Sequence, residues 1–247
     1  MNTLIIIPAR YASTRLPGKP LADIKGKPMI QHVYERAAQA FDAIFVATDD
    51  SRIQDAIRAF SGRSVLTSTK HQSGTDRCSE ALEKAEKETG KTFDIIINLQ
   101  GDEPLIDARQ IKELETLFDN PDTQIATQVK IISNLQDLTD PDQPKVVLDK
   151  NKNALYFSRQ AIPYIRDPKN NELLKEHTFY KHIGLYGYRK ETLKEIVKLK
   201  QSPLELAEKL EQNRWLENAY KIQCGITQYE NFSVDTKNDL KKINMLI

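Results

Sequence analysis

The sequence predicts an α/β protein in which helices cover both faces of a mixed, mainly parallel β-sheet, with an antiparallel hairpin added to it. Two observations lead to this fold class. Short runs rich in β-branched residues alternate with helical patterns, which is typical of βαβ units around a parallel sheet. The region 145–159 breaks this rhythm, because two apolar runs flank a turn-rich stretch, and this pattern indicates a hairpin.

The individual elements follow from the same patterns. Strands are predicted over Thr3–Pro8, Ala43–Thr48, Ser64–Leu66 and Phe93–Leu99. Helices are predicted over 28–41, after a cap at Ser51, after a cap at Ser73 or Thr75, from Asp107 to about Asp119, over 203–217, and from Asp235 to the last residue. Such an order predicts a three-layer, Rossmann-like sandwich.

Composition excludes several functional classes. The 247 residues carry 36 basic and 35 acidic side chains, a formal net charge of +1, which argues against a nucleic-acid or membrane-surface partner. No apolar stretch approaches the roughly 20 residues of a membrane helix. Cys78 and Cys224 form neither a zinc pattern nor a disulfide framework. We therefore expect a soluble, cytoplasmic protein that folds as one domain over residues 1–247.

The stretch 5–21 is the most informative part of the chain. An apolar strand leads directly into a loop that carries Arg10, Arg15 and Lys19, with small residues such as Ser13 between them. Ligands of open α/β sheets bind outside the carboxyl ends of strands, so the loop is a candidate phosphate site. It is neither a GxxxxGK P-loop nor a GxGxxG fingerprint. Taken alone, the three cations are also consistent with a solvated basic surface.

Two aspartates follow apolar segments and each has two interpretations. Asp102 comes after Gly101 at the end of a predicted strand, where it is either a turn residue or a carboxylate in the crevice. Asp235 precedes the last predicted helix, where Asp or Thr is an expected N-cap and Asp239 can complete a capping box with Thr236.

Several motifs resemble one known family. They are HQSGTDR at 71–77, NLQGDEP at 98–104, KVVLDKNKNALYFSR at 145–159, KHIGLYGYR at 181–189, SPLELAEKLEQNRWLE at 202–217 and SVDT at 233–236. Together with the first loop, and in this order and spacing, they resemble the cytidylyltransferases that activate acidic sugars. The resemblance covers almost the whole chain and implies a nucleotidyltransferase fold.

The resemblance also assigns the site residues. It implies that the CTP is held by Pro8, Ala9, Arg10, Ser13, Lys19, Ser73, Gly74, Thr75, Arg77, Gln100 and Asp102. It implies that the sugar acid is held by Arg159, His182, Tyr186, Glu211 and Gln212, residues that sequence spacing alone would leave as packed or solvated side chains. It places Mg²⁺ on Asp102 and Asp235, and makes these two aspartates, Arg10 and Lys19 the catalytic set.

The implied substrates are CTP and, from the motifs of the C-terminal half, 3-deoxy-manno-octulosonate (Kdo), a building block of lipopolysaccharide. The nucleotide part would cover about 1–130 and 225–247, and the sugar and dimer part of a homodimer about 131–224. Two alternatives stay open. One is a cytidylyltransferase for another acidic sugar, such as a sialic acid or an amino analogue of Kdo. The other is a non-catalytic regulator that binds sugar nucleotides.

Overall fold

The computed structural model describes residues 1–13, 15–167 and 172–247. The strands are β1 (Thr3–Ala9), β2 (Asp23–Ile24), β3 (Lys27–Pro28), β4 (Ile44–Thr48), β5 (Ser64–Leu66), β6 (Ile95–Asn98), β7 (Ile125–Ile131), β8 (Lys145–Leu148), β9 (Ala154–Ser158), β10 (Tyr180–Arg189) and β11 (Ile222–Ile226). The α-helices are α1 (Met29–Ala37), α2 (Ser51–Ala59), α3 (Gly74–Thr89), α4 (Ala108–Thr116), α5 (Leu135–Thr139), α6 (Leu173–Glu176), α7 (Lys190–Ile196), α8 (Pro203–Glu208), α9 (Gln212–Glu217) and α10 (Lys237–Leu246), with short 3₁₀ turns at Lys19–Leu21 and Leu117–Asp119.

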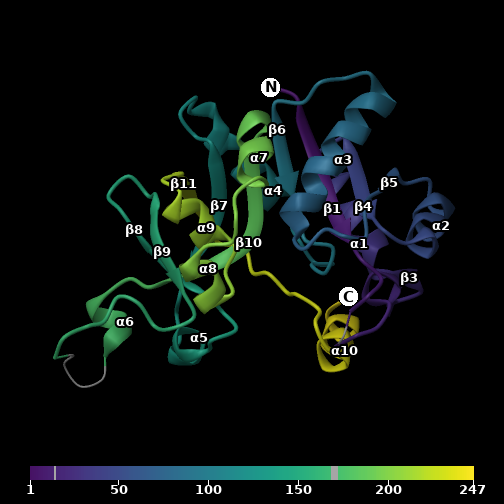
Figure 1. Cartoon of the computed structure of the whole chain (residues 1–247). Coiled ribbons are helices and arrows are strands. Elements are labelled where there is room, and N and C mark those ends of the chain that lie inside the picture. The colour runs from purple at the N-terminus through teal and green to yellow at the C-terminus, as the bar shows by residue number, and fades with distance from the viewer. Residues whose placement is uncertain (14, 168–171) are drawn as a thin grey trace.

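One mixed sheet organises the molecule. Its main path runs β11-β7-β10-β6-β1-β4-β5, and β8 and β9 are attached through β10 (Figure 1). β1 pairs in parallel with β4 and β6, and β11 pairs in parallel with β7. β10 runs antiparallel to β6, β7 and β8. The predicted fold class, a mixed and mainly parallel sheet with a hairpin, is confirmed.

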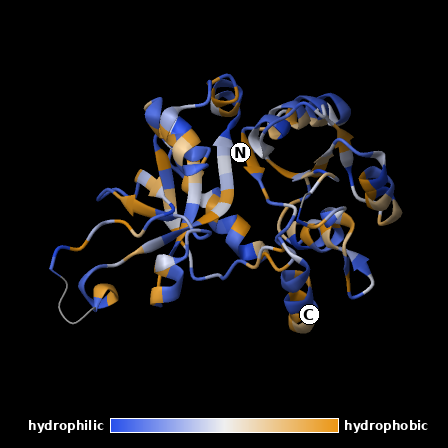
Figure 2. Ribbon diagram, turned by 60° about the horizontal axis from the view of Figure 1, so that its bottom comes forward, coloured by the Kyte–Doolittle hydropathy of each residue, from blue (hydrophilic) through white to orange (hydrophobic). Residues whose placement is uncertain are grey.

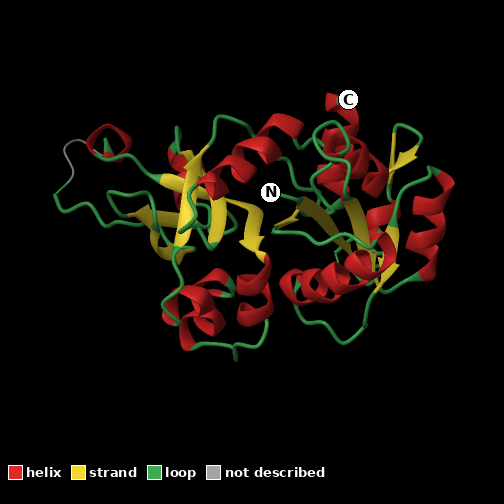
Figure 3. Ribbon diagram, turned by 90° about the horizontal axis from the view of Figure 1, so that it is seen from above, coloured by secondary structure: helices red, strands yellow, loops and turns green. Residues whose placement is uncertain are grey.

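Successive side chains along a strand point to opposite faces of the sheet, so each face packs against its own apolar core. Along β1, Leu4 and Ile6 pack into the core under α3, while Ile5 and Ile7 pack into the core under α1. Helices therefore lie on both faces of the sheet, as Figure 3 shows from above. Hydrophobic residues recur along the strands, while the helices alternate between hydrophobic and hydrophilic residues (Figure 2). All four β1 residues are 0% exposed, which explains why the strand reads as a continuous apolar run.

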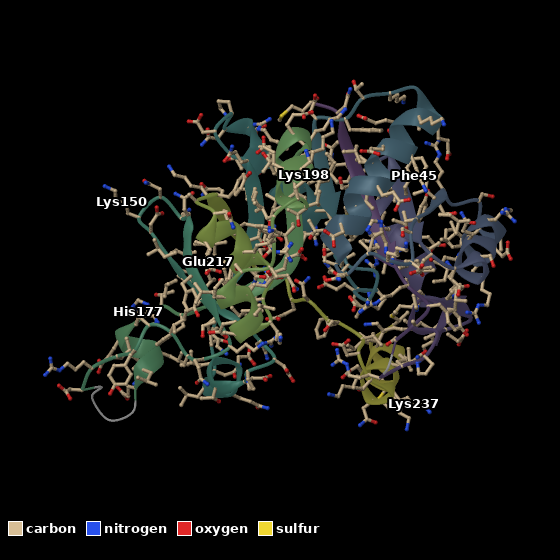
Figure 4. All side chains as sticks on the ribbon, in the orientation of Figure 1. Phe45, Lys150, His177, Lys198, Glu217 and Lys237 are labelled. Atoms are coloured by element: carbon tan, nitrogen blue, oxygen red, sulfur yellow. The ribbon has the colours of Figure 1, made fainter. Side chains whose placement is uncertain are left out.

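The hairpin 145–159 is present as β8 and β9. Lys150, in the turn between the two strands, lies at the periphery of the molecule, far from Phe45 in the core of the opposite half (Figure 4). The last helix, α10, lies on the opposite side of the molecule from the hairpin (Figure 1). The segment before α10 crosses from the β10 side to the β1 side (Figure 1), where Ile243 joins a small apolar cluster with Ile24 and Met29.

Two local predictions were wrong. The predicted helix over 203–217 is interrupted, because Lys209 adopts a left-handed conformation with φ 55° and separates α8 from α9. The cap of α2 is Asp50, whose side chain accepts a hydrogen bond from the Arg52 amide, instead of Ser51. Helical periodicity continues across Lys209, so local sequence gave no sign of the break.

Gly187 supplies a test of the packing. A Cβ at this position of β10 would lie 2.6 Å from Phe118 Cε2, a buried ring atom. Gly187→Ala is therefore expected to lower the free energy of unfolding by about 1–3 kcal/mol, since overpacking forces buried neighbours to move. Gly184→Ala in the same strand is the control, because its nearest neighbour would be Gln100 Cγ at an ordinary 3.8 Å. Denaturant unfolding measures both variants, and equal stabilities would contradict the packing.

Candidate active site

A cavity of about 400 Å³ opens at the carboxyl ends of β1 and β6. Its walls come from the loop after β1, the segment that begins α3, the turn after β6 and the segment that precedes α10. The lining residues are Pro8, Ala9, Arg10, Ala12, Ser13, Arg15, Lys19, Pro20, His71, Gln72, Ser73, Gly74, Arg77, Gln100, Gly101, Asp102 and Asp235. Every residue predicted for the nucleotide except Thr75 lies on this wall, although the segments are far apart in the sequence.

Glycine makes the close approach of two strand ends possible. A Cβ at Gly101 would lie 2.9 Å from the backbone oxygen of Pro8, which is closer than Cβ atoms come to a backbone atom. Gly101 is absent from the positions with positive φ among the described residues, so contact distance and not a left-handed turn requires glycine here. The turn that carries Asp102 thereby lies directly against the start of the loop after β1.

Lys19 joins the two predicted carboxylates. Its Nζ lies 2.6 Å from Asp102 Oδ2 and 3.0 Å from Asp235 Oδ1. Arg15 Nη2 lies 2.9 Å from the same oxygen of Asp235. Burial disfavours the charge of Lys19, but the Asp102 carboxylate and then Asp235 outweigh it, so that the pKa of Lys19 is raised above its ordinary value. Lys19 is therefore an ammonium ion throughout the neutral pH range.

Asp235 reaches the cavity because its neighbours fix the backbone. The Val234 amide donates to the Asp102 carbonyl at 2.9 Å, which aligns the two aspartate-bearing segments. Thr236 is the N-cap of α10 and forms the predicted capping box with Asp239. Since Thr236 caps the helix, the carboxylate of Asp235 is available for the cavity.

The start of α3 connects this cavity with the C-terminal half. Ser73 and Asp76 form a capping box, which fixes the start of α3 beside the cavity that Ser73 and Gly74 line. The Thr75 hydroxyl donates to Glu211 Oε2 at 2.8 Å, and Glu211 is the N-cap of α9. Burial raises the pKa of Glu211, although the Thr75 and Ser73 hydrogen bonds oppose the shift.

Arg77 lines the cavity but has partners of its own. Its guanidinium is buried, donates to the Thr67 hydroxyl and pairs with Asp49 at 2.9 Å. Asp49 follows β4 and Thr67 follows β5, so these contacts connect the start of α3 to the ends of these two neighbouring strands. Neither Asp49 nor Thr67 was predicted, and no local pattern in the sequence marks them as partners of Arg77.

A second cavity of about 420 Å³ is lined in part by the same two segments, 100–103 and 231–235, that contribute to the first. Its lining residues are Glu103, Asp142, Gln143, Pro144, Lys181, His182, Ile183, Gly184, Asn231, Phe232 and Ser233. Asp102 and Asp235 line the first cavity, while Glu103 and Ser233 line the second. The carboxylate pair thus stands close to the boundary between two spaces. Glu103 and Ser233 were not predicted, although both stand in the quoted motifs.

Two residues predicted for the sugar belong to an aromatic cluster near the second cavity. The His182 ring packs against Phe157 at 5.1 Å and Tyr186 at 5.3 Å between centroids. Desolvation lowers the pKa of His182 to about 3, so the imidazole is neutral near pH 7 and can offer hydrogen bonds but no charge. Tyr186 packs edge-on against Trp215 of α9. Gln212, also on α9, is buried.

Arg159 is held at the base of the hairpin. Its Nε donates to the Glu208 carbonyl at 2.7 Å and its Nη1 to the Pro141 carbonyl at 2.9 Å. Both acceptors are carbonyl oxygens that orient the guanidinium, while the nearby Glu208 carboxylate accepts from the Arg159 backbone amide at 2.9 Å and interacts with the Arg159 charge. Pro141 directly precedes the 142–144 wall of the second cavity. The structure therefore brings Arg159 near that wall but does not bring it together with Glu211, which contacts Thr75.

The donors present fit a hard divalent cation that is shared with a phosphate ligand. Among the described residues, no group of three or more His, Cys, Asp or Glu side chains could hold a metal ion. Asp102 and Asp235 converge on one ammonium ion, so their oxygens also face a common space. Mg²⁺ is commonly bound by one or two carboxylates together with substrate phosphates, which matches this donor set.

Fold and site together define a class of protein. A cation-rich loop and two carboxylates at the carboxyl edge of a mainly parallel sheet are typical of an α/β protein that binds a nucleotide phosphate chain. Residues 4–222 match the family described as Cytidylyltransferase. The chain belongs to this cytidylyltransferase family.

Individual relatives agree over nearly the full length. The chain is 56% identical over 246 residues to the 3-deoxy-manno-octulosonate cytidylyltransferase of Parabacteroides distasonis, covering 98% of this chain and 96% of the relative. It is 50% identical over 245 residues to the protein of the same name from Thermodesulfovibrio yellowstonii, with the same coverage.

Two solved structures share the fold of this chain at different levels of sequence identity. The structure of CMP:2-keto-3-deoxy-manno-octonic acid synthetase complexed with CTP superposes with a TM-score of 0.90 at 42% identity, and covers 100% of this chain and 98% of that chain. A putative glucose-1-phosphate thymidylyltransferase from Bacillus anthracis shares the fold at a TM-score of 0.65 and 19% identity, with 99% and 94% of the two chains covered.

Proposed function

We infer that this chain transfers the CMP group of CTP to the anomeric hydroxyl of Kdo and releases pyrophosphate. The observation that carries the proposal is the position of the carboxylate pair. Asp102 and Asp235 face a cation-rich cavity at the sheet edge, and their own segments form a wall of a second cavity. A nucleotide in the first space and a sugar acid in the second would meet at this pair. Relatives at 56% and 50% identity are named for this activity.

The proposed reaction needs no protein nucleophile. The 2-hydroxyl oxygen of the sugar forms a bond to the α-phosphorus, the bond from that phosphorus to the β-phosphate bridge oxygen breaks so that pyrophosphate leaves, and the hydroxyl proton passes to solvent water. Negative charge accumulates on phosphoryl oxygens, where Arg10, Arg15 and Lys19 line the wall. Cations fixed in advance stabilise this charge without reorganising at the moment of reaction.

We propose further that Asp102 and Asp235 hold Mg²⁺ when the nucleotide is bound. The ion would neutralise phosphate charge and lower the pKa of a hydroxyl in its coordination sphere. The aspartates supply two anionic oxygens, and Lys19 and Arg15 fix the orientation of these carboxylates. The homodimer expected from the resemblance stays a prediction. No helix in the described ranges is long and apolar enough to cross a membrane.

On the sugar side, we propose that His182, Tyr186, Glu211, Gln212 and Arg159 bind the acid and its hydroxyls. Four of them lie on β10, on α9 or at the N-cap of α9, and these two elements pack against each other through Tyr186 and Trp215. His182 opens onto the second cavity as a neutral hydrogen-bonding group. Arg159 keeps a positive charge beside that wall, which suits a carboxylate.

Pyrophosphate release across a panel of sugar acids tests the function. With CTP and Mg²⁺, Kdo is expected to give the highest kcat/KM, and sialic acid or an eight-carbon amino analogue of Kdo a much lower value. The panel is repeated with Glu211→Gln, which keeps the size of the side chain but replaces an acceptor by a donor. This variant should raise KM for the sugar and leave CTP affinity unchanged.

The alternatives make different forecasts for the same panel. Preference for another acidic sugar would keep the cytidylyltransferase chemistry and overturn the Kdo assignment. CTP binding without pyrophosphate release for any sugar acid would favour a non-catalytic regulator. Loss of CTP binding in Glu211→Gln with unchanged sugar dependence would place this residue on the nucleotide.

A further inference from the structure

The loop after β1 is closed by contacts at its own base. The Gly18 amide donates to the Tyr11 carbonyl at 3.2 Å, so the two ends of the loop meet. Gly18 has φ 66°, and a Cβ there would lie 3.2 Å from Tyr11 Oη, which shows that the Tyr11 side chain lies against Gly18. The spacing between Arg10 and Lys19 across the cavity therefore depends on where Tyr11 stands.

Tyr11 is held in turn by α2. The guanidinium carbon of Arg52 lies 3.4 Å from the centroid of the Tyr11 ring. Arg52 is fixed by Asp50, which accepts from its Nε at 2.9 Å and from its Nη2 at 2.6 Å. Asp50 also caps α2. A surface arginine is thus oriented by a planar two-bond contact and stacked on an aromatic ring.

Neither Tyr11 nor Arg52 lines the cavity, although Arg10 and Ala12, on either side of Tyr11 in the sequence, do. The Arg52 side chain is 58% exposed, so its ion pair with Asp50 contributes little to global stability. What the contact fixes is the path of the loop. Asp50 is the N-cap of α2 and Arg52 lies in its first turn, so the loop is anchored to the start of this helix.

We propose that Asp50, Arg52 and Tyr11 form a strut that positions Arg10 and Lys19, the cations at the two ends of the loop after β1, for the triphosphate, and that Arg52 is a positioning residue for nucleotide binding. The inference rests on the proposed function, because it concerns the same CTP site. It predicts an effect on affinity without direct contact. Removing the strut lets the loop cations spread, so bound phosphate must pay the cost of ordering them.

Arg52→Ala tests the proposal, and Arg58→Ala is the matched control. Arg58 lies on the same helix, pairs with Asp55 one turn away at 3.0 Å and is 77% exposed, so both variants lose one surface charge of α2. Calorimetric titration with CTP should give a Kd about fivefold higher for Arg52→Ala, the effect of losing one cation–π contact, and an unchanged Kd for Arg58→Ala. KM for CTP should follow Kd while kcat is retained.

Two further variants separate positioning from direct phosphate contact. Arg10→Ala removes a cation that lines the cavity, so it should reduce the salt dependence of CTP binding, whereas Arg52→Ala should leave that dependence unchanged. Tyr11→Phe keeps the ring under Arg52 and should bind CTP as the wild type does, while Tyr11→Leu should match Arg52→Ala. Thermal unfolding midpoints for all variants identify any loss of fold.

The outcomes are distinct. If the wild type does not bind CTP, the proposed function fails and the strut with it. If the wild type binds CTP and Arg52→Ala equals Arg58→Ala, the strut is wrong and the function stands. A reduced salt dependence in Arg52→Ala would overturn positioning in favour of direct contact. If Tyr11→Phe were as weak as Tyr11→Leu, the aromatic contact would not be the link.

Discussion

Asp235→Asn and Asp102→Asn are each expected to lower kcat at least about a hundredfold, a barrier increase of about 3 kcal/mol, while the protein stays folded. Each change removes one anionic oxygen ligand from the pair that faces the cavity. An amide keeps the size of the carboxylate but not its charge, so the proposed Mg²⁺ would lose one of its two protein ligands. Steady-state turnover at saturating Mg²⁺, CTP and Kdo measures the effect.

The structure provides a control that separates catalysis from helix capping. Thr236 caps α10 through its hydroxyl, next to Asp235. Thr236→Ala should therefore cost about 1 kcal/mol of stability, as expected for a lost N-cap, and retain most of the turnover. Asp235→Asn should retain the stability and lose most of the turnover. Near wild-type turnover in Asp235→Asn would show that this carboxylate is not part of the catalytic set.

Local sequence predicted where the cations of the first loop lie, but left their role open between a phosphate site and a solvated surface. An apolar strand followed by closely spaced cations places the side chains by chain connectivity alone, so Arg10 and Lys19 were predicted at the sheet edge before any tertiary contact was known. The capping box of Thr236 and Asp239 was predicted for the same reason, since its donors and acceptors are three residues apart.

The convergence of Asp102 and Asp235 needed a longer-range source of information. Each has an ordinary local role, and only the crossing of the segment before α10 brings Asp235 to Lys19. Family resemblance supplied that pairing. The contacts of Arg52 with Tyr11 were not predicted, because a cation and a ring on separate elements leave no periodic signal in the sequence.

The break at Lys209 shows how tertiary contacts override local preference. Continuing the helix would remove the turn that separates Glu205 from Arg214, whose side chains form a buried ion pair. Burial raises the pKa of Glu205 but the Arg214 guanidinium outweighs it, so the carboxyl pKa is lowered below its ordinary value. A left-handed residue costs free energy locally, and this pair together with the Glu211 contact to Thr75 offsets that cost.

Lys19→Met is expected to have opposite effects on the two ligands of the site. CTP binding should weaken at least about tenfold, the free energy of one hydrogen bond to a charged group, because an ammonium ion is lost from the cavity wall. Divalent ions should bind more tightly to the nucleotide-free protein. Lys19 Nζ pairs with the carboxylates of Asp102 and Asp235, at 2.6 and 3.0 Å. Its removal leaves the two carboxylates without that counter-charge.

Separate calorimetric titrations with CTP and with Mn²⁺ measure the two effects without relying on turnover. Lys27→Met is the matched control, because Lys27 is 46% exposed and pairs with Glu35 away from the cavity lining. This control should change neither affinity. Unchanged CTP affinity in Lys19→Met would mean that the loop cations form a solvated surface and not a phosphate site. Unchanged Mn²⁺ affinity would mean that the two aspartates do not form a common metal site. Weaker CTP binding together with tighter Mn²⁺ binding would support a model in which a metal ion replaces Lys19 at the two carboxylates when the triphosphate binds.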